Sequence, residues 1–518
     1  MAGRQSGPVT KMFGAGRRGI DRYSMIAAID PDALYDALNV RYHNGSLRQR
    51  MGLVTEASIS GTTPPSAWTR PVGSFSCQKS NGAPIIFVQT LSQRFKLDDF
   101  TSGSWTNITG TDVPGGSADQ PARLTSVLVG SDVNIVSVNG FDDISASVNG
   151  GNFTDVDTGS AGSDLPTFTD ITTVRNRLVA IAPPYKVQWC EPFTTTQWLP
   201  LNFKLLSQTP GHVVAVRSTG PDSCIVYKQD SIWMGQSGPG APSGDMAFAF
   251  VAYREGPAGP SAVVDADGMQ YYMTSSGRIG MVSGGQHAWI AEGIWPYLSG
   301  DIDPLYPMRI WGTYDALNHE VLFFYVRSGD AGVGPLGGIL LKLPRPSTGV
   351  DWYAAYPCIY GIPLSTGCPV NVTSFNAGTQ YPSGTFLVHA HATTPVPELL
   401  SPSGLTDDSV AFTARFQTGV LPVKDVVEIG KIEIEVFAER AGGYGTIDIQ
   451  PVTSYILDAA GGTVGSAQSI DLTTSTLTRD VHGYNVSGRF IGLRGTWTSD
   501  TSTVRYKGAV MTGYQLEA

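Results

Sequence analysis

The sequence predicts an all-β protein, a β-propeller followed by a β-sandwich, and three observations lead to this prediction. The 518 residues include 61 Gly and 34 Pro, and only 15% are charged, which favours many turns and few solvent-facing helices. Short apolar runs alternate with turn residues along most of the chain. These runs also recur at a nearly constant interval. An irregular stack of β-sandwich domains is the alternative that the same pattern allows.

The repeating unit is clearest from Pro84 to Thr109. A buried strand is predicted at residues 84–89 and a second strand at 91–98, and a Gly turn with Trp105 ends the unit. One such unit cannot bury both of its faces, so further copies must pack against it. Similar units have first strands centred on these residues: Phe87, Ile135, Val179, Val226, Tyr271, Leu322 and Phe386.

The intervals between these centres are 48, 44, 47, 45, 51 and 64 residues. A period in the forties with several short strands per unit is typical of a propeller blade. We therefore predict about seven irregular blades in a propeller domain at residues 61–402. Linkers rich in Thr, Ser and Pro lead into and out of this region.

The first 60 residues are predicted to form a separate N-terminal unit that begins with a flexible arm. Residues 1–22 carry five basic residues and one acid without any periodicity, as in an arm that is mobile or docked on a partner. Gly14–Gly19 matches the GxGxxG pattern letter for letter. No strand precedes it and no amphipathic helix follows, which argues against a dinucleotide site.

A short helix and a hairpin are predicted after the arm. Asp30 can cap a helix that continues to Leu38, and Asn44-Gly45 supplies the positive φ angles of a tight hairpin turn. Arg48 and Arg50 share one face of the second hairpin strand. With the arginines of the arm they form a candidate interface for another subunit or an acidic partner, and a solvated face is the alternative. The candidate interface consists of Arg17, Arg18, Arg22, Arg48 and Arg50.

Residues 403–518 are predicted to form a separate C-terminal β-sandwich. In Lys431–Val436 the apolar side chains alternate with charged ones, as a half-exposed antiparallel strand requires. Further strands of similar texture follow as far as residue 516.

The net charge and the cysteine content limit which partners and which compartment are expected for this chain. A net charge of -10 and a pI near 5.2 argue against broad adhesion to nucleic acid, which works through clustered Lys and Arg. No run of about 18 apolar residues predicts a membrane span, and no signal peptide is visible at the N-terminus. Five cysteines without a CxxC spacing predict buried free thiols in a reducing cytoplasm rather than disulfides.

No catalytic, cofactor or metal site is predicted, and the chain is not expected to be an enzyme. His389 and His391 share one strand face but lack a third ligand. Residues 265–268 begin like a calcium loop, but the distal carboxylate is absent, and a turn explains the stretch better. Paired acids such as Asp407-Asp408 lie in predicted turns. A propeller-type glycosidase would need two carboxylates brought together, which sequence alone cannot place.

Seven segments of the chain carry a resemblance to known sequences: Gly19–Arg22, Ile29–Leu34, Asn39–Arg41, Gly45–Gly52, Tyr253–Gly256, Ser261–Val264 and Gly268–Ile279. They resemble one family, the tail nozzle or tail tubular proteins of short-tailed, podovirus-like bacteriophages. Together they cover less than a fifth of the chain. Where that family usually has Arg-Pro-Gly after the hairpin, this chain has Arg50-Met51-Gly52.

The resemblance implies a structural virion protein that is made in the host cytoplasm and built into the phage tail. Such subunits form a homohexameric ring that docks below the portal and adaptor proteins, carries tail fibres or tailspikes, and conducts double-stranded DNA without sequence-specific binding. The acidic balance suits this role, because duplex DNA would not adhere to the wall. The alternative functions are a propeller-type glycan-binding adhesin and a glycoside hydrolase.

Overall fold

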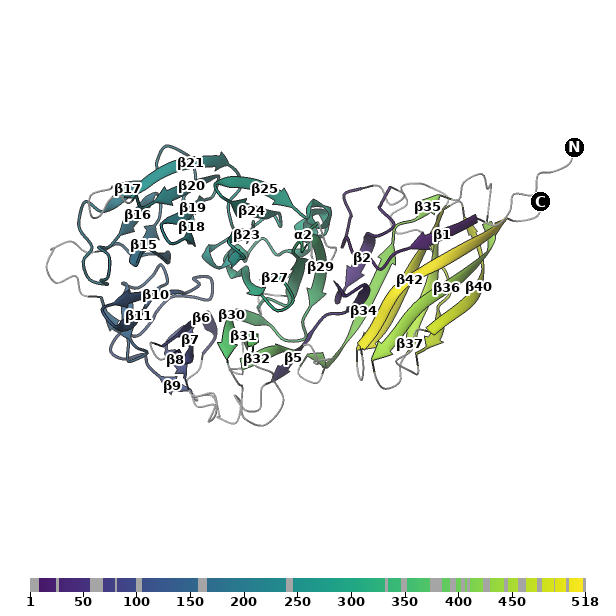
Figure 1. The fold of residues 1–518 in the computed structure, drawn as a ribbon, viewed down its shortest axis with the longest axis horizontal. Helices are drawn as coiled ribbons and strands as arrows, with labels where there is room; N and C mark the ends of the chain where they lie inside the picture. Colours follow the sequence, from purple (N-terminus) through teal and green to yellow (C-terminus); the bar gives the residue numbers. More distant parts are fainter. Residues whose placement is uncertain are drawn as a thin grey trace, which may run out of the picture.

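The computed structural model shows a propeller joined to a sandwich (Figure 1). The residues that the structure describes are 9–24, 28–55, 69–79, 82–98, 105–156, 165–238, 246–330, 334–345, 352–372, 384–391, 397–401, 406–407, 410–422, 429–441, 446–454, 463–472, 478–488, 490–499 and 503–515. No helix in these ranges is both long and apolar enough to cross a bilayer.

Six four-stranded antiparallel sheets follow one another along the chain, each with its strands in sequence order. Each sheet is one blade of the propeller, numbered in chain order. Blade 1 consists of β6 (Pro71–Gln78), β7 (Pro84–Thr90), β8 (Arg94–Leu97) and β9 (Thr106–Asn107). Blade 2 consists of β10 (Arg123–Val129), β11 (Asp132–Val138), β12 (Ser145–Val148) and β13 (Thr154–Asp155), and blade 3 of β14 (Asp170–Val174), β15 (Arg177–Ala182), β16 (Lys186–Trp189) and β17 (Phe203–Leu205). Blade 4 consists of β18 (Val213–Gly220), β19 (Ser223–Lys228), β20 (Ser231–Gln236) and β21 (Ala247–Tyr253). Blade 5 consists of β22 (Val263–Ala266), β23 (Met269–Met273), β24 (Ile279–Ser283) and β25 (Gln286–Ile290), and blade 6 of β26 (Trp311–Asp315), β27 (Glu320–Tyr325), β28 (Gly337–Lys342) and β29 (Ala354–Ile359). The helix α2 (Trp295–Asp301) and three short 3-10 turns lie between blades 4 and 6.

The seventh blade combines three strands that follow blade 6 with one strand from the N-terminal segment. It consists of β30 (Leu364–Val372), β31 (Gly384–His391), β32 (Pro397–Ser401) and β5 (Gly52–Thr55). The last of these comes from the N-terminal segment and pairs antiparallel with β32, with Leu53 opposite Leu400. The strand that completes the last blade, β5, therefore precedes all the other blades in the sequence. It also confirms the prediction of about seven blades.

The first strand of each blade lies next to the first strand of the following blade, in the order β6, β10, β14, β18, β22, β26 and β30. Strand β30 in turn lies next to β6, so the series closes into a ring, which is visible at the left of Figure 1. At this seam the Ser74 hydroxyl lies 2.9 Å from that of Thr366, and the Ser76 hydroxyl donates to the Pro369 carbonyl. The propeller is therefore a complete ring of seven sheets.

The strands predicted as the first of each blade are in fact the second. Phe87 lies in β7 and Ile135 in β11, and the innermost strands β6 and β10 precede them. Strand β7 is buried along almost its whole length, whereas β10 alternates between buried and partly exposed residues. The innermost strands face the central channel and carry polar residues. The apolar runs recognised in the sequence are therefore the second strands of the blades. The repeat interval was right, and the position within the blade was wrong by one strand.

The C-terminal sandwich has two sheets. One contains β36 (Ile429–Ala441), β40 (Thr478–Gly488) and β42 (Thr503–Gln515), and the other contains β34 (Val410–Thr418), β37 (Thr446–Ser454) and β41 (Phe490–Ser499), with short edge strands β33 (Thr406–Asp407), β35 (Leu421–Pro422), β38 (Thr463–Val464) and β39 (Gln468–Asp471). Ile432, Ile434 and Val436 are buried between the sheets, and the intervening charged residues are not. The predicted alternation in this strand is confirmed.

The N-terminal segment is not a separate unit, contrary to the predicted boundary at residue 60. It adds β1 (Val9–Phe13) to β42, β2 (Leu34–Leu38) to β34, and the hairpin of β3 (Val40–His43) and β4 (Ser46–Gln49) to β42. Residues 1–8 of the predicted flexible arm lie outside the described residues. Residues 9–13 are a paired strand, because the open edge of β42 offers backbone partners that a sequence pattern cannot reveal.

The helix predicted from Asp30 to Leu38 is wrong. The Asp30 side chain accepts a hydrogen bond from the Asp32 backbone N–H at 2.8 Å, which makes a turn, and β2 begins at Leu34. Pairing with β34 overrides the local helix signal. The hairpin prediction is confirmed: Asn44 and Gly45 have φ angles of 47° and 77°, as a two-residue turn of this kind requires.

One hydrophobic core joins the two domains. It contains Ile432 and Ile434 of the sandwich, Leu34 of the N-terminal segment, and Tyr271 and Phe324 of blades 5 and 6. Strand β33 also pairs in parallel with β5, where Asp407 lies opposite Leu53. Continuous packing and shared backbone pairing hold the propeller and the sandwich against each other.

Candidate functional site

A cavity of about 570 Å³ lies on the axis of the propeller. It is lined from the innermost strands of blades 1, 2, 4, 5, 6 and 7, so it must lie where these strands converge. Its polar lining includes Ser74, Arg123, Arg217, Asp265 and Thr313. Concave sites with mixed apolar walls and a few converging polar groups are the usual places for ligands.

Three charged residues in consecutive blades form a belt beside this cavity. Asp170 on β14 is fully buried, and its Oδ1 lies 3.2 Å from the Nε atom of Arg123 on β10. Its other oxygen accepts from Arg217 on β18 and from the Val216 backbone N–H at 2.8 Å. One carboxylate therefore ties three blades together through charge-assisted hydrogen bonds.

The belt carries more positive charge than Asp170 can balance. Burial, together with the nearby charge of Arg217, lowers the pKa of Arg123 to about 10, so Arg123 remains a cation at neutral pH. Burial raises the pKa of Asp265, the next charged residue around the axis, although Arg217 and Arg123 oppose this shift. Among the described lining residues Asp265 is the one carboxylate that faces this cavity.

A second cavity of about 590 Å³ opens where the innermost strands begin. Asp230 and Glu255 contribute carboxylates to its wall, beside His212 and Met308. The Glu255 carboxylate is bound by Ser276, whose hydroxyl donates to Oε2 at 2.9 Å. These two acids are the carboxylates that a hydrolase hypothesis would have to use here.

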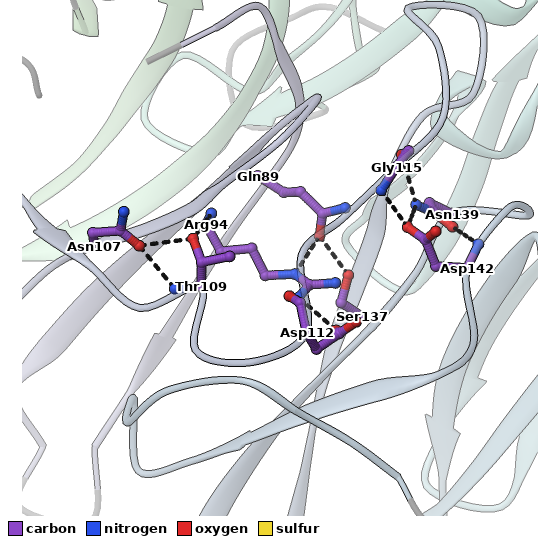
Figure 2. Close-up of polar contacts among 9 residues, drawn as sticks. All are labelled: Gln89, Arg94, Asn107, Thr109, Asp112, Gly115, Ser137, Asn139 and Asp142. Atoms are coloured by element: carbon purple, nitrogen blue, oxygen red, sulfur yellow. Dashed lines mark hydrogen bonds and ion pairs between the residues drawn. The ribbon is translucent and has the colours of Figure 1, made fainter. Parts of the chain in front are cut away.

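The junction of blades 1 and 2 contains a polar cluster, which Figure 2 shows. Arg94 on β8 is buried, and its Nη1 atom donates to the carbonyl and to the carboxylate of Asp112 at 2.7 and 2.6 Å. Its Nε atom donates to Gln89 Oε1 at 3.0 Å, which also accepts from Ser137 of blade 2 at 2.6 Å. The Arg94 guanidinium lies 4.6 Å from the ring centroid of Phe153.

Further side chains hold the start and the middle of the connection between β9 and β10. The Asn107 side chain accepts from the hydroxyl of Thr109 at 2.7 Å, and Asp142 accepts from the Gly115 backbone N–H at 2.6 Å (Figure 2). Asn139 donates to the same Asp142 carboxylate. The contacts of Arg94 with Asp112 and of Gln89 with Ser137 link blade 1 to the connection and to blade 2, which accounts for a structural role.

Arg50, one of the five arginines of the predicted interface, lies in the junction of the two domains. Its guanidinium donates to both oxygens of Asp407, to the Ile359 carbonyl at 2.7 Å and to Asn39 Oδ1 at 3.1 Å. The guanidinium carbon lies over the rings of Tyr360 and Phe412, at 4.1 and 4.0 Å from their centroids. Burial opposes its charge, but Asp407 raises the pKa of Arg50 above its ordinary value. Arg50 is therefore unavailable to an outside partner in this structure.

The other four arginines are partly exposed and bound within the chain. Arg17 and Arg18 contact Asp32 and Asp30 at 2.8 and 3.0 Å, and both guanidinium groups lie against the Trp352 ring. Arg22 pairs with Asp36 and lies over the ring of Tyr297. Arg48 donates to Ser46, and burial together with Arg505 and Arg41 lowers its pKa to about 10.

Sequence reasoning missed the acids of the domain junction. Asp407 was placed in a turn, but it lies in β33 and is 1% exposed. Glu320 in β27 is also fully buried, between Lys342 at 3.1 Å and Arg41 at 3.4 Å. No local pattern distinguishes these acids from exposed ones, because the arginines that pair with them, Arg41 and Arg50, lie 279 and 357 residues away in the chain.

The other candidate sites considered in the sequence are the calcium-like loop, the histidine pair and the cysteines. Asp267 and Gly268 have φ angles of 51° and 77° in the hairpin between β22 and β23, so the turn interpretation of the calcium-like loop is confirmed. The side chains of His389 and His391 lie outside the described part, although their strand β31 is present. All five cysteines are free, as predicted. No group of three metal-binding side chains occurs among the described residues.

Comparison with known proteins finds no matching family model and no matching curated sequence. Solved structures share parts of the architecture at low identity. YCF48 bound to a D1 peptide matches with a TM-score of 0.37 and 10% identity over 71% of this chain and 99% of that one. BamB from Moraxella catarrhalis matches with a TM-score of 0.34 and 7% identity over 71% and 99%. The extracellular domain of BT4673 from B. thetaiotaomicron matches at 0.40 and 10% over 86% and 63%.

These likenesses are too distant to carry any argument about function. The assignment of the propeller rests instead on the closed ring of seven sheets in this chain.

Proposed function

We propose that this chain is a structural subunit of the tail nozzle of a short-tailed bacteriophage. The observation that carries the proposal is where the family-like segments lie. Arg22, Asn39, Arg41 and Arg50 all belong to those segments, and all contact residues that join the propeller to the sandwich. The N-terminal share of the resemblance therefore falls on the part of the sequence that joins the two domains, and the remaining segments lie in blades 4 and 5.

A rigid subunit suits a ring that must keep its bore under the pressure of packaged DNA. The N-terminal segment supplies strands to both sheets of the sandwich and to the last blade, and it crosses the junction between them. Each blade is also fixed by its neighbours. Identical copies with such a body can close into a cyclic ring, and six copies are proposed here.

The DNA path in this proposal lies between subunits, along the axis of the ring. The cavity on the axis of each propeller has a volume of about 570 Å³, which is far too small for a duplex, and the Arg123, Asp170 and Arg217 belt lies beside it. A net charge of -10 per chain disfavours adhesion of phosphates to the bore. Portal and adaptor proteins would bind above this ring, and fibres or tailspikes would attach to it.

The first test is the mass of the purified full-length chain, measured by analytical ultracentrifugation together with negative-stain imaging. The expected result is a ring of about six times 55.1 kDa, alone or after mixing with phage tail components. A second test is labelling of virions with an antibody to this chain. A chain that stays monomeric in every mixture and is absent from virions contradicts the proposal.

The rival functions are a glycan-binding adhesin and a glycoside hydrolase. The second cavity, with Asp230 and Glu255 in its wall, gives the hydrolase a specific hypothesis. A panel of glycosides tests it: turnover that is lost in Asp230→Asn and Glu255→Gln would favour the hydrolase. Binding of intact glycans without turnover, combined with labelling at the tips of tail fibres, would favour the adhesin.

A further inference from the structure

We propose that a row of basic side chains on the sandwich binds a dianionic phosphate group, as in inorganic phosphate or a phosphate monoester. Three observations lead to this inference. Three arginines lie directly opposite one another on adjacent strands, one of them has no carboxylate partner in the described part of the chain, and the exposed part of the row has more positive than negative charges. The site belongs to a single subunit and does not depend on the ring proposed above.

The strand register places the arginines side by side. Arg41 on β3 lies opposite Arg48 on β4, and Arg48 lies opposite Arg505 on β42. Glu439 on β36 lies opposite Arg505 on the other edge of β42. Side chains directly opposite each other in antiparallel strands project from the same face, with Cβ atoms about 4.5–5.5 Å apart. Arg41, Arg48 and Arg505 therefore form one row across three strands, the arginine row, and Glu439 ends it.

Arg48, in the middle of the row, has no counter-charge among the described residues. Its Nε atom donates to the Ser46 hydroxyl at 3.0 Å, and its terminal amino groups have no hydrogen bond or ion pair in the part of the chain that the structure describes. Burial and the charges of Arg505 and Arg41 lower the pKa of Arg48 to about 10, against a smaller effect of Glu439, so it remains a cation at neutral pH. Like charges directly opposite each other destabilise a sheet, and a bound anion would remove this cost.

The other basic side chains of this face have less negative charge than they need. Arg505 and Lys507 share one carboxylate, because Glu439 Oε1 lies 3.1 Å from Arg505 Nη1 and Oε2 lies 2.8 Å from Lys507 Nζ. The side chains of Arg505 and Lys507 are 32% and 40% exposed. Arg48, Arg505 and Lys507 thus carry three positive charges against the one negative charge of Glu439, which leaves an excess of two.

Arg41 does not add to this excess, because it is 6% exposed and pairs with Glu320 at 3.4 Å. The surroundings of His43, on the same hairpin, are nevertheless positive. Burial lowers the pKa of His43 to about 4, and the charges that add to this effect are those of Arg41, Arg48, Lys342 and Arg505. The chain as a whole has a net charge of -10, so the positive charge here is a local feature of this face.

The excess of two charges matches a phosphate dianion better than other anions. A phosphate monoester carries about −1.5 to −2 charges at pH 7 and three acceptor oxygens. A carboxylate or one phosphodiester of a nucleic-acid backbone carries a single charge and would neutralise half of the excess. A guanidinium with free terminal N–H groups can bind two phosphate oxygens at once, as Arg48 can here, and Lys507 adds a flexible point charge.

The test is isothermal titration of inorganic phosphate into the purified full-length chain at low ionic strength, with acetate at the same ionic strength as the reference. We expect phosphate to bind at least about tenfold more tightly than acetate. Adenosine 5′-monophosphate distinguishes the two sources of this chemistry: tighter binding than phosphate indicates a monoester ligand, and equal binding indicates the free ion. A short DNA duplex with 5′-hydroxyl ends tests the phosphodiester backbone.

Two variants and one control locate the site. Arg48→Gln is expected to weaken phosphate binding by at least about tenfold. Without ligand its melting temperature should be unchanged or higher, because the repulsion by Arg41 and Arg505 is removed. Phosphate should raise the melting temperature of the native chain but not that of Arg48→Gln. Lys507→Gln should weaken binding by about threefold to tenfold. Arg175→Gln removes one positive charge from blade 3, where the side chain is 47% exposed, and binding should not change.

Three results would overturn the inference: no detectable phosphate binding at millimolar concentration, equal binding of acetate, and equal phosphate binding by Arg48→Gln and Arg175→Gln. Tighter binding of the duplex than of phosphate, lost in Arg48→Gln, would also overturn it, because the row would then bind a nucleic-acid backbone. If Arg48→Gln fails to fold, Lys507→Gln decides. A monomer that binds phosphate contradicts only the ring, and a ring that does not bind phosphate contradicts only this inference.

Discussion

Arg50 and Asp407 lie 357 residues apart in the sequence and form a two-pronged, fully buried ion pair. The pair is the point where three parts of the fold meet. Arg50 follows the N-terminal hairpin, Asp407 belongs to the strand that leads into the sandwich, and Asp407 also accepts from the Gly361 backbone N–H beyond blade 6 at 2.8 Å. This buried pair therefore reinforces the shared core and the backbone pairing that position the propeller against the sandwich.

Removing one partner of this pair should destabilise the protein strongly. Asp407→Asn leaves the buried Arg50 cation without its counter-charge, and we expect a loss of about 3–5 kcal/mol in the free energy of unfolding. Urea unfolding followed by tryptophan fluorescence measures it. Lys431→Met is the control, because it breaks an exposed ion pair with Glu433 and should cost less than about 1 kcal/mol. Equal losses in the two variants would show that the junction pair has no special role.

The closing strand of the last blade should control the stability of the propeller seam. Leu53 in β5 is fully buried, and its backbone N–H donates to Asp407 at 3.3 Å. Leu53→Ala leaves a cavity and should cost about 2–5 kcal/mol. Hydrogen exchange is expected to accelerate first in β32, the strand that pairs with β5. Uniform acceleration in all seven blades would contradict a local seam.

Two glycines with similar backbone angles should respond differently to alanine. Gly19 has a φ angle of 72°, and an added Cβ atom would lie 2.5 Å from the Ala355 backbone nitrogen. Gly45 has a φ angle of 77° and nothing within 4 Å of such an atom. Gly45→Ala should cost about 1 kcal/mol from strain alone. Gly19→Ala should cost more than Gly45→Ala, because the N-terminal segment must also separate from blade 6. Equal shifts in melting temperature would refute this close contact.

Mild acid should destabilise the chain through two histidines. Burial lowers the pKa of His43 and that of His287 to about 4, with Arg41 and Arg254 respectively adding to the effect. Each folded pKa lies below the unfolded value of about 6.5, so this contribution to stability is complete above pH 6.5 and is lost as the pH falls towards 4. The opposite shift of Asp265, whose pKa burial raises, favours the folded state as the pH falls.

Melting temperatures recorded between pH 7 and pH 4.5 test this pH dependence. We expect a steady decline in the native chain and a smaller decline in His287→Gln, which retains a polar group near the Tyr272 hydroxyl. An identical decline in both proteins would assign the acid sensitivity to other groups.

The sequence by itself determined the all-β class, the repeat interval near 47 residues, the Asn44-Gly45 hairpin and the alternating strand at Lys431–Val436. These features follow from local properties: apolar periodicity, the φ angles that Asn and Gly tolerate, and turn chemistry. Such signals act over a few residues. They can therefore be recognised in the sequence without knowledge of the long-range contacts.

Only the tertiary structure decided where the N-terminal segment lies, which strand of each blade faces the axis, and which charges are buried. Leu34–Leu38 forms a strand because it pairs with the edge of β34, and Asp407 can be buried because it forms an ion pair with Arg50. Edge pairing and burial depend on partners hundreds of residues away, and no local pattern carries that information. The cavity beside Arg123 and Thr313 is likewise a product of the closed ring.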